Sequence, residues 1–408
     1  MAISVAFGLV IGLAACAPDQ SVSIDVPEQV DGAFPEETQT QLQDAVSRAI
    51  TATGSTGAIV GVWAPWSGSW VDGVGTTTPG GAEVSADMQF RAGKVTRAMT
   101  CDVFYELVDE GVVGRNDEVA EWVSGAADLT DVTLEMLCDN TSGLASYSSK
   151  LLGLWLSNPE RTWVPLELAS YGLGQGRVAE PGAQYTDSDS GYLLLGLALE
   201  NASGERMPAL IEKYVTDPLD LENTYLAAGP TEAPQLNGLR SPRIEGVWNC
   251  AEPTDVTPVS LTTGYSDSGV MTNVTDLARY VRALATGALT GTQRFEDGRP
   301  PSRSSSSWFT AAGGAFQAGS LVGQHGSVPG YMTAAYADPE SGLTVVIVLN
   351  NSSATPNHVT WLALQLAAIA SKAPAASGQE TPSAGLPWTA EQFAQPIAEN
   401  AICSAPSE

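Results

Sequence analysis

Positive charge is scarce in this chain. Its 408 residues include 18 Lys and Arg against 46 Asp and Glu, so the formal net charge is −28 at pH 7. Nucleic acid and anionic lipid surfaces repel such a chain, and we expect neither as a partner unless a covalent anchor holds the protein at a membrane. The acidity is otherwise typical of a solubilising surface.

Metal ligands are also scarce. Histidine occurs only at His325 and His358, and the five cysteines form no Cys-x-x-Cys motif. Zinc sites need three or four His, Cys or carboxylate ligands close together. We therefore expect no metal and no other cofactor.

The N-terminal apolar run, residues 3–15, is too short to span a bilayer as a stable helix. It ends in Leu-Ala-Ala-Cys at positions 13–16, which resembles the bacterial lipobox. A lipobox predicts a signal peptide over 1–16, a lipidated Cys16, a tether over 17–35 and an exported protein anchored at the bacterial cell membrane or envelope. A basic segment before the apolar run is missing, and a plain signal peptide with an incidental cysteine is the alternative.

The overall composition is that of a globular protein, with 43% hydrophobic and 16% charged residues. Its length suits one large domain or two closely packed ones. Hydrophobic periodicity predicts a helix and two strands near the N-terminus, then mostly helix from 95 to 287, then four strands and a helix. The predicted helices are 36–53 and 355–370, and the predicted strands are 57–64, 69–74, 311–318, 319–324, 331–338 and 343–350.

One motif relates this order of helices and strands to a known protein family. Residues 90–100 read Phe-Arg-Ala-Gly-Lys-Val-Thr-Arg-Ala-Met-Thr, an extended segment that turns at Gly93 into a helix. Phe-Arg-x-Gly-Ser-x-x-Lys begins the active-site helix of the serine β-lactamase and D-Ala-D-Ala carboxypeptidase (penicillin-binding) superfamily, and the chain resembles its class C and esterase-like branch. Further resemblance lies at 129–144, 217–225 and 268–280.

The resemblance covers about residues 36–372 and implies an α+β fold. In that β-lactamase/transpeptidase-like fold, an antiparallel sheet is flanked by N- and C-terminal helices and joined to an all-helical region. The sheet part would be about 36–93 and 308–372, and the helical part about 94–307. Residues 373–408 lie beyond the resemblance and are predicted to be a Pro/Ala/Ser linker and a C-terminal tail.

The family's nucleophilic serine falls on Lys94, and the lysine that activates it falls on Arg97. None of the four lysines, at 94, 150, 213 and 372, follows a serine at the required spacing, so no Ser-x-x-Lys exists in the chain. Acyl transfer by this family needs that serine and a nearby base. The first catalytic motif is therefore not intact.

The second motif is altered in the same way. Residues 181–192 align with the family's Pro-Gly-x-x-Phe-x-Tyr-Ser-Asn-x-Gly-Tyr. Asp187 then falls on the tyrosine that helps to move the proton, and Asp189 on the asparagine that contacts substrate. A shift by one residue would instead align Ser188, Asp189 and Ser190 with a Ser-Asp-Asn motif, but the flanking Pro-Gly and Gly-Tyr pairs argue against it.

In the third motif the expected cation is replaced by Gln324, while Gly326 and Ser327 are retained. His325 stands one place along the strand. Because neighbouring side chains of a strand point to opposite faces, this histidine is not expected to substitute for the missing cation. The N–H of Ser327 could still form half of an oxyanion hole.

The replacements carry opposite charges, so we expect Lys94 and Arg97 to form an ion-pair network with Asp187 and Asp189. The sequence thus favours a pseudoenzyme: an envelope lipoprotein that binds or regulates, with a peptidoglycan-type peptide or an envelope protein as its partner. One alternative is a serine hydrolase of carboxypeptidase, β-lactamase or esterase type that uses Ser188 or Ser327. Another is a structural surface lipoprotein with no ligand.

Four cysteines remain besides Cys16, and four cysteines allow three disulfide connectivities. In the family, the segment after Cys138 packs near the active-site helix, which here carries Cys101. The resemblance therefore favours a Cys101–Cys138 disulfide, which leaves Cys250 to pair with Cys403.

Overall fold

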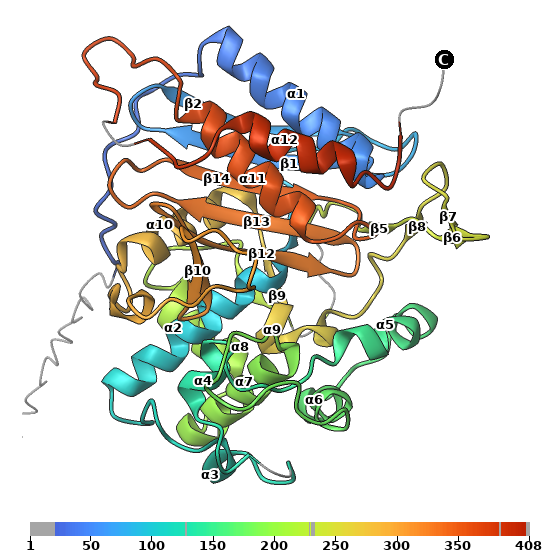
Figure 1. The fold of residues 1–408 in the computed structure, drawn as a ribbon, viewed down its shortest axis with the longest axis vertical. Coiled ribbons are helices and arrows are strands. Elements are labelled where there is room, and N and C mark those ends of the chain that lie inside the picture. The colour runs from blue at the N-terminus through green and yellow to red at the C-terminus, as the bar shows by residue number, and fades with distance from the viewer. Residues whose placement is uncertain (1–20, 127–128, 228, 230–232, 383–384, 405–408) are drawn as a thin grey trace, which may run out of the picture.

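The structure, a computed structural model, describes residues 21–126, 129–227, 229, 233–382 and 385–404 (Figure 1). The predicted signal peptide, with Cys16, lies outside these residues. Among the helices that are described, none is both long and apolar enough to cross a membrane.

A seven-stranded antiparallel sheet, assembled from both ends of the chain, forms the centre of the molecule. The N-terminal strand β1 pairs with β14 near the C-terminus, so that Val60 lies opposite Ile347. The order across the sheet is β10-β11-β12-β13-β14-β1-β2. The strands are β1 Gly57–Ala64, β2 Gly68–Gly75, β10 Phe309–Ala312, β11 Ala315–Ala318, β12 Leu321–Val328, β13 Tyr331–Ala337 and β14 Thr344–Leu349.

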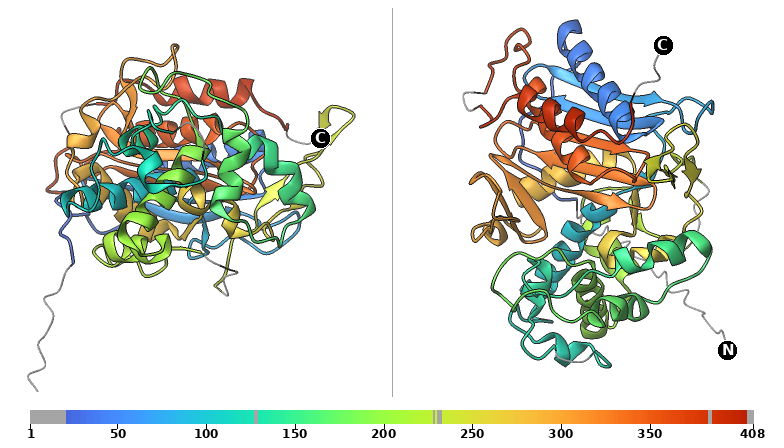
Figure 2. Two further views of the ribbon diagram at one scale, coloured as in Figure 1. Left: turned by 90° about the horizontal axis from the view of Figure 1, so that it is seen from below. Right: turned by 45° about the vertical axis from the view of Figure 1, so that its right-hand side comes forward.

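One face of the sheet is covered by α1 (Glu36–Thr53), α11 (Asn357–Ala370) and α12 (Ala390–Glu399) (Figures 1 and 2). Helix α1 buries Leu42, Ala45 and Val46 at helical spacing, and it ends at Gly54, which takes the left-handed φ of +67° common at helix C-termini. Val60 and Ile347 face these helices, whereas Ile59 and Val348 face the helical region. Both faces of the central strands are thus buried.

The other face packs against the helical region, which α2 (Thr96–Asp109) joins to the sheet (Figure 2). The region's remaining helices are α3 Val119–Trp122, α4 Leu134–Cys138, α5 Ser148–Ser157, α6 Pro165–Leu173, α7 Asp189–Ser203, α8 Met207–Ile211, α9 Tyr265–Ser268 and α10 Val274–Thr286. Asn273 caps the N-terminus of α10, and its side chain accepts a hydrogen bond from the Asp276 N–H.

The structure corrects three expectations about elements. The region 94–307 is not all-helical, because it contains short strands that satisfy one another's backbone groups. The segment 311–318 is a hairpin and not one strand, because Gly313 and Gly314 both take positive φ and turn the chain. The tail contains α12, which packs on α11. The short strands of this region are β4 Tyr225–Leu226, β5 Leu239–Arg240, β6 Arg243–Ile244, β7 Val247–Trp248, β8 Thr254–Asp255 and β9 Val270–Thr272, and β9 also pairs with β3 Phe90–Arg91 just before it.

Candidate functional site

Lys94 lies where the extended strand β3 turns into α2. The turn is a single 3-10 turn, Gly93–Val95, and Gly93 has a φ of +58°, a conformation that suits glycine. The aliphatic stem of Lys94 then lies directly against β12. A Cβ atom on Gly326 would come within 2.7 Å of the Lys94 Cβ, so glycine at 326 is what allows this close approach.

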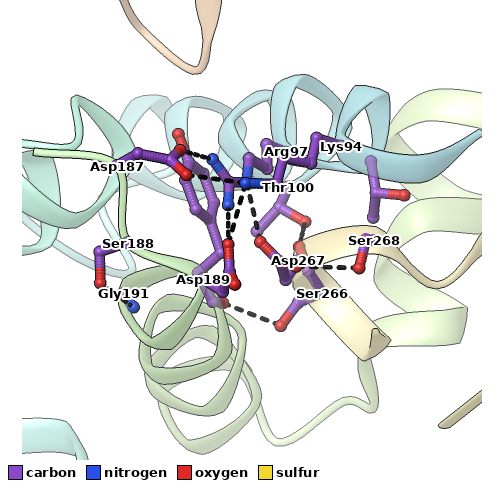
Figure 3. Close-up of polar contacts among 12 residues, drawn as sticks. Lys94, Arg97, Thr100, Asp187, Ser188, Asp189, Gly191, Ser266, Asp267 and Ser268 are labelled. Carbon is purple, nitrogen blue, oxygen red and sulfur yellow. Dashed lines mark hydrogen bonds and ion pairs between the residues drawn. The ribbon is translucent and has the colours of Figure 1, made fainter. Parts of the chain in front are cut away.

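The head of Lys94 meets two carboxylates (Figure 3). Its Nζ is 2.7 Å from Asp187 Oδ2 and 3.0 Å from Asp189 Oδ1. One turn further along α2, the Arg97 guanidinium contacts both carboxylates as well, with Nη2 2.6 Å from Asp189 Oδ1 and Nη1 against Asp187 Oδ1. The structure therefore brings together all four residues that replace the first and second motifs.

A fifth charged residue, Asp267 on α9, completes this group. Its Oδ1 accepts a hydrogen bond from Arg97 Nε at 2.8 Å, and its Oδ2 accepts one from the Ser268 hydroxyl. Sequence reasoning missed Asp267, because the segment at 268–280 suggested only the start of a helix. The available signal was a single carboxylate just before that segment, in an otherwise uncharged stretch. We call Lys94, Arg97, Asp187, Asp189 and Asp267 the charge cluster.

The charge cluster is mostly shielded from solvent. The side chains of Arg97, Asp189 and Asp267 are 2–4% exposed, whereas that of Asp187 is 46% exposed. Arg97 also lies 4.7 Å from the centre of the Tyr192 ring. A fully buried guanidinium is tolerated here because three carboxylates and one aromatic face surround it.

Ionisation in the charge cluster follows from this packing. Burial alone would raise the pKa of Asp187, but Arg97 and Lys94 outweigh it and hold that pKa well below its ordinary range. Burial and Arg97 would lower the pKa of Lys94, but the facing carboxylates raise it. Burial raises the pKa of Asp267 to about 6 even beside Arg97. At neutral pH the amine of Lys94 is therefore held as an ammonium.

The loop that carries Asp187 and Asp189 is fixed by its own hydrogen bonds. The Ser188 N–H donates to Asn140 Oδ1 at 3.0 Å, and the Asp189 N–H donates to the Ser146 hydroxyl at 3.1 Å. Ser188 is fully buried, and its hydroxyl accepts from the Gly191 N–H as the N-cap of α7. The two carboxylates are thus held in place by a loop that is exposed at Asp187 and buried from Ser188 onward.

Comparison with known proteins now identifies the family. A family model described as Beta-lactamase matches residues 42–369. The chain belongs to the beta-lactamase family.

Curated relatives of this beta-lactamase-family chain match part of it. The D-alanyl-D-alanine-carboxypeptidase/endopeptidase AmpH of Escherichia coli (strain K12) is 28% identical over 173 residues, which cover 40% of this chain and 43% of that protein. Penicillin-binding protein 4* of Bacillus subtilis (strain 168) is 26% identical over 212 residues, 48% of this chain and 44% of that protein. The matches thus span less than half the length of these relatives.

Solved structures share the fold. A D-stereospecific amidohydrolase from Streptomyces sp. superposes with a TM-score of 0.69 at 20% identity, covering 79% of this chain and 98% of that one. The octameric penicillin-binding protein homologue from Pyrococcus abyssi gives 0.67 at 20% identity, covering 81% and 77%. The predicted β-lactamase/transpeptidase-like α+β fold is confirmed.

In the family's third motif, Gln324 and His325 take different faces of β12. The Gln324 amide donates to the Gly314 carbonyl at 2.7 Å. The His325 ring stacks on Phe316 at 4.5 Å, and its Nδ1 lies 2.6 Å from the Tyr336 hydroxyl. Phe316 and Tyr336 belong to the core under α1 and α11, so His325 is directed away from the charge cluster.

The two serines considered as alternative nucleophiles are poorly placed. Ser188 is buried and caps a helix. Ser327 follows Gly326 along β12, and since Gly326 faces Lys94, strand alternation directs the Ser327 side chain to the other face of the sheet. Neither hydroxyl shares the surface on which the charge cluster lies.

Two disulfides are present in the described chain, Cys101–Cys138 and Cys250–Cys403. These are the pairs that the resemblance favoured. The first joins α2, one turn beyond Arg97, to the end of α4. Cys138 there lies two residues before Asn140, which holds the Ser188 loop. Both sides of the charge cluster are therefore covalently linked.

Proposed function

We propose that this beta-lactamase-family protein is a catalytically inactive member that serves as a binding or regulatory module, exported and anchored at the cell envelope through Cys16. The observation that carries the proposal is Lys94 at the position of the nucleophile, ion-paired to Asp187 and Asp189 at 2.7 and 3.0 Å. A protonated amine has no lone pair with which to attack a carbonyl carbon. The position is occupied by a group that cannot start acyl transfer.

Two further features support inactivity. The stem of Lys94 fills the space beside Gly326, where the retained glycine of the third motif would face a substrate. A cavity lined by Asn140, Gln324 and Tyr192, whose ring packs on Arg97, measures about 10 Å³, which leaves room for at most one water molecule. An acyl group placed against Gly326 would have to displace the stem of Lys94.

A peptidoglycan-type peptide or an envelope protein is the proposed partner. The support is that a curated relative is named a D-alanyl-D-alanine-carboxypeptidase. A peptide ending in D-Ala-D-Ala would then bind beside the charge cluster without being cleaved.

Turnover and acylation test this proposal together. The purified protein should hydrolyse nitrocefin, p-nitrophenyl esters and a D-Ala-D-Ala peptide at no more than the background rate. After incubation with a fluorescent penicillin, intact mass should show no adduct. Loss of a catalytic nucleophile typically lowers the rate roughly 10⁶-fold. A rate of hydrolysis near that of an active relative would therefore refute the proposal.

Variants distinguish the serine alternative. If an adduct does form, Ser188→Ala and Ser327→Ala should each be tested for its loss. An adduct abolished by either substitution would identify a working hydrolase with a displaced nucleophile.

A further inference from the structure

The start of the described chain runs past helix α10, beside the sheet (Figure 1). An open cavity lies between α10 and the segment 21–26. Its volume is about 590 Å³, within the range of roughly 300–1,000 Å³ typical of small-molecule sites. The segment is held there by the Val22 N–H, which donates to the Pro218 carbonyl at 2.7 Å. The cavity is separate from the charge cluster.

Two arginines of α10, Arg279 and Arg282, line this cavity together with Thr275, Ser21 and Ser23. Residues at positions i, i+4 and i+7 of a helix share one face, so Thr275, Arg279 and Arg282 all point the same way. Their side chains offer two guanidinium groups and a hydroxyl, and the two serines add further hydroxyls from the opposite wall.

Arg282 lacks a counterion. Its Nε donates to the Thr344 hydroxyl at 2.9 Å, and its guanidinium lies 5.1 Å from the centre of the Trp63 ring. Within the described part of the chain, no carboxylate lies within ion-pair distance of it. The two terminal nitrogens are therefore available to a ligand.

Arg279 adds a second positive charge to the cavity, and its own partners lie away from Arg282. Its Nε donates to the Leu219 carbonyl, and its Nη2 reaches Asp220 only at 3.4 Å, on the exposed surface. Burial, and then the neighbouring Arg279, lower the pKa of Arg282 to about 10. Like charges three residues apart on a helix destabilise it.

The polar groups that line this cavity can all donate hydrogen bonds. The cavity gathers two arginines and three hydroxyls, and no carboxylate is among the described residues that line it.

We propose that this cavity binds the phosphate group of an organic phosphate. Guanidinium groups form paired hydrogen bonds with tetrahedral oxyanions, and the hydroxyls supply further donors. The ligand neutralises the Arg279–Arg282 pair, and the size of the cavity leaves room for the organic part. The phosphate belongs either to a soluble phosphate ester or to a phospholipid headgroup.

Calorimetry tests whether the cavity binds phosphate, which is the chemistry that both candidate ligands share. The full chain carrying Cys16→Ala, so that no lipid contributes, is titrated with inorganic phosphate and with glycerol 3-phosphate against chloride at matched ionic strength. Arg282→Gln should weaken binding at least tenfold, and Thr275→Ala, an exposed position that leaves the fold unaffected, about threefold. Arg48→Gln, which removes an exposed arginine of α1, is the matched control and should change affinity less than twofold.

Vesicle co-sedimentation separates the two sources. Binding to phosphatidylglycerol vesicles that depends on Arg282 assigns the site to a lipid headgroup, and binding of the soluble phosphates alone assigns it to a soluble ester. Absence of saturable binding in both assays overturns the proposal. So does binding that Arg48→Gln weakens as much as Arg282→Gln, since that would reflect net charge alone.

Discussion

At the scale of single residues, alignment of flanking positions predicted which charges meet. Phe90, Arg91 and Gly93 fix the position of Lys94, and the Gly-Tyr pair at 191–192 fixes that of Asp189. The structure places their charged atoms 3.0 Å apart. Asp267 could not be predicted this way, because no flanking motif relates it to α2, and its contact with Arg97 depends on how α9 packs.

Arg97→Ala should be one of the most destabilising single substitutions in the charge cluster. It leaves the buried Asp189 and Asp267 without their guanidinium partner, and an uncompensated buried charge costs about 3–5 kcal/mol. Arg115→Ala removes an exposed arginine paired with Glu135 and should cost less than about 1 kcal/mol. Urea unfolding gives both values.

The double substitution Arg97→Met with Asp267→Leu should cost less than the sum of its two singles, because it removes both members of a buried pair. Additive costs, or an Arg97→Ala value no larger than that of Arg115→Ala, would show that the charge cluster contributes no coupled stability.

At the scale of helices and strands, a strong hydrophobic pattern predicted the bounds of an element correctly. The predicted bounds of α1, 36–53, and of β1, 57–64, match the structure because an amphipathic stripe and Gly54 define the first and a continuous apolar run defines the second. Helix α12 could not be predicted from a Pro/Ala/Ser-rich neighbourhood that contains Pro396. Its stability comes from the core that it covers, and tertiary packing of this kind is not visible in local propensity.

Trp388, just before α12, should therefore behave as a core residue. Its Nε1 donates to the Leu364 carbonyl at 3.0 Å, its ring lies 4.7 Å from Trp308, and only 6% of it is exposed. Trp388→Ala should lower the free energy of unfolding by about 3–5 kcal/mol. The control is Trp248→Ala on the β6–β7 hairpin, expected to cost about 1 kcal/mol or less. Equal urea midpoints for the two variants would mean that the tail is not part of the cooperative core.

At the scale of the whole molecule, the resemblance and the order of the helices and strands predicted the fold. Composition predicted only that the chain is large and globular. The pairing of β1 with β14 and the Cys250–Cys403 disulfide both join segments far apart in sequence. Such contacts carry a large entropic cost of loop closure, and nothing local in the sequence specifies them. The spacing of the cysteines left three connectivities open for the same reason.

Attachment of the molecule to a membrane should depend on Cys16 alone. A net charge of −28 opposes adsorption to an anionic bilayer, so the protein needs a covalent anchor to stay there. In fractionated cells the wild type should sediment with membranes and resist a high-salt wash, whereas Cys16→Ala should move to the soluble fraction. Ala17→Ser, which leaves the cysteine intact, is the control and should remain with the membranes. Arg282→Gln should also remain with the membranes, because it leaves the lipid anchor on Cys16 intact. A wild type that is soluble after export would rule out lipidation and leave a cleaved signal peptide.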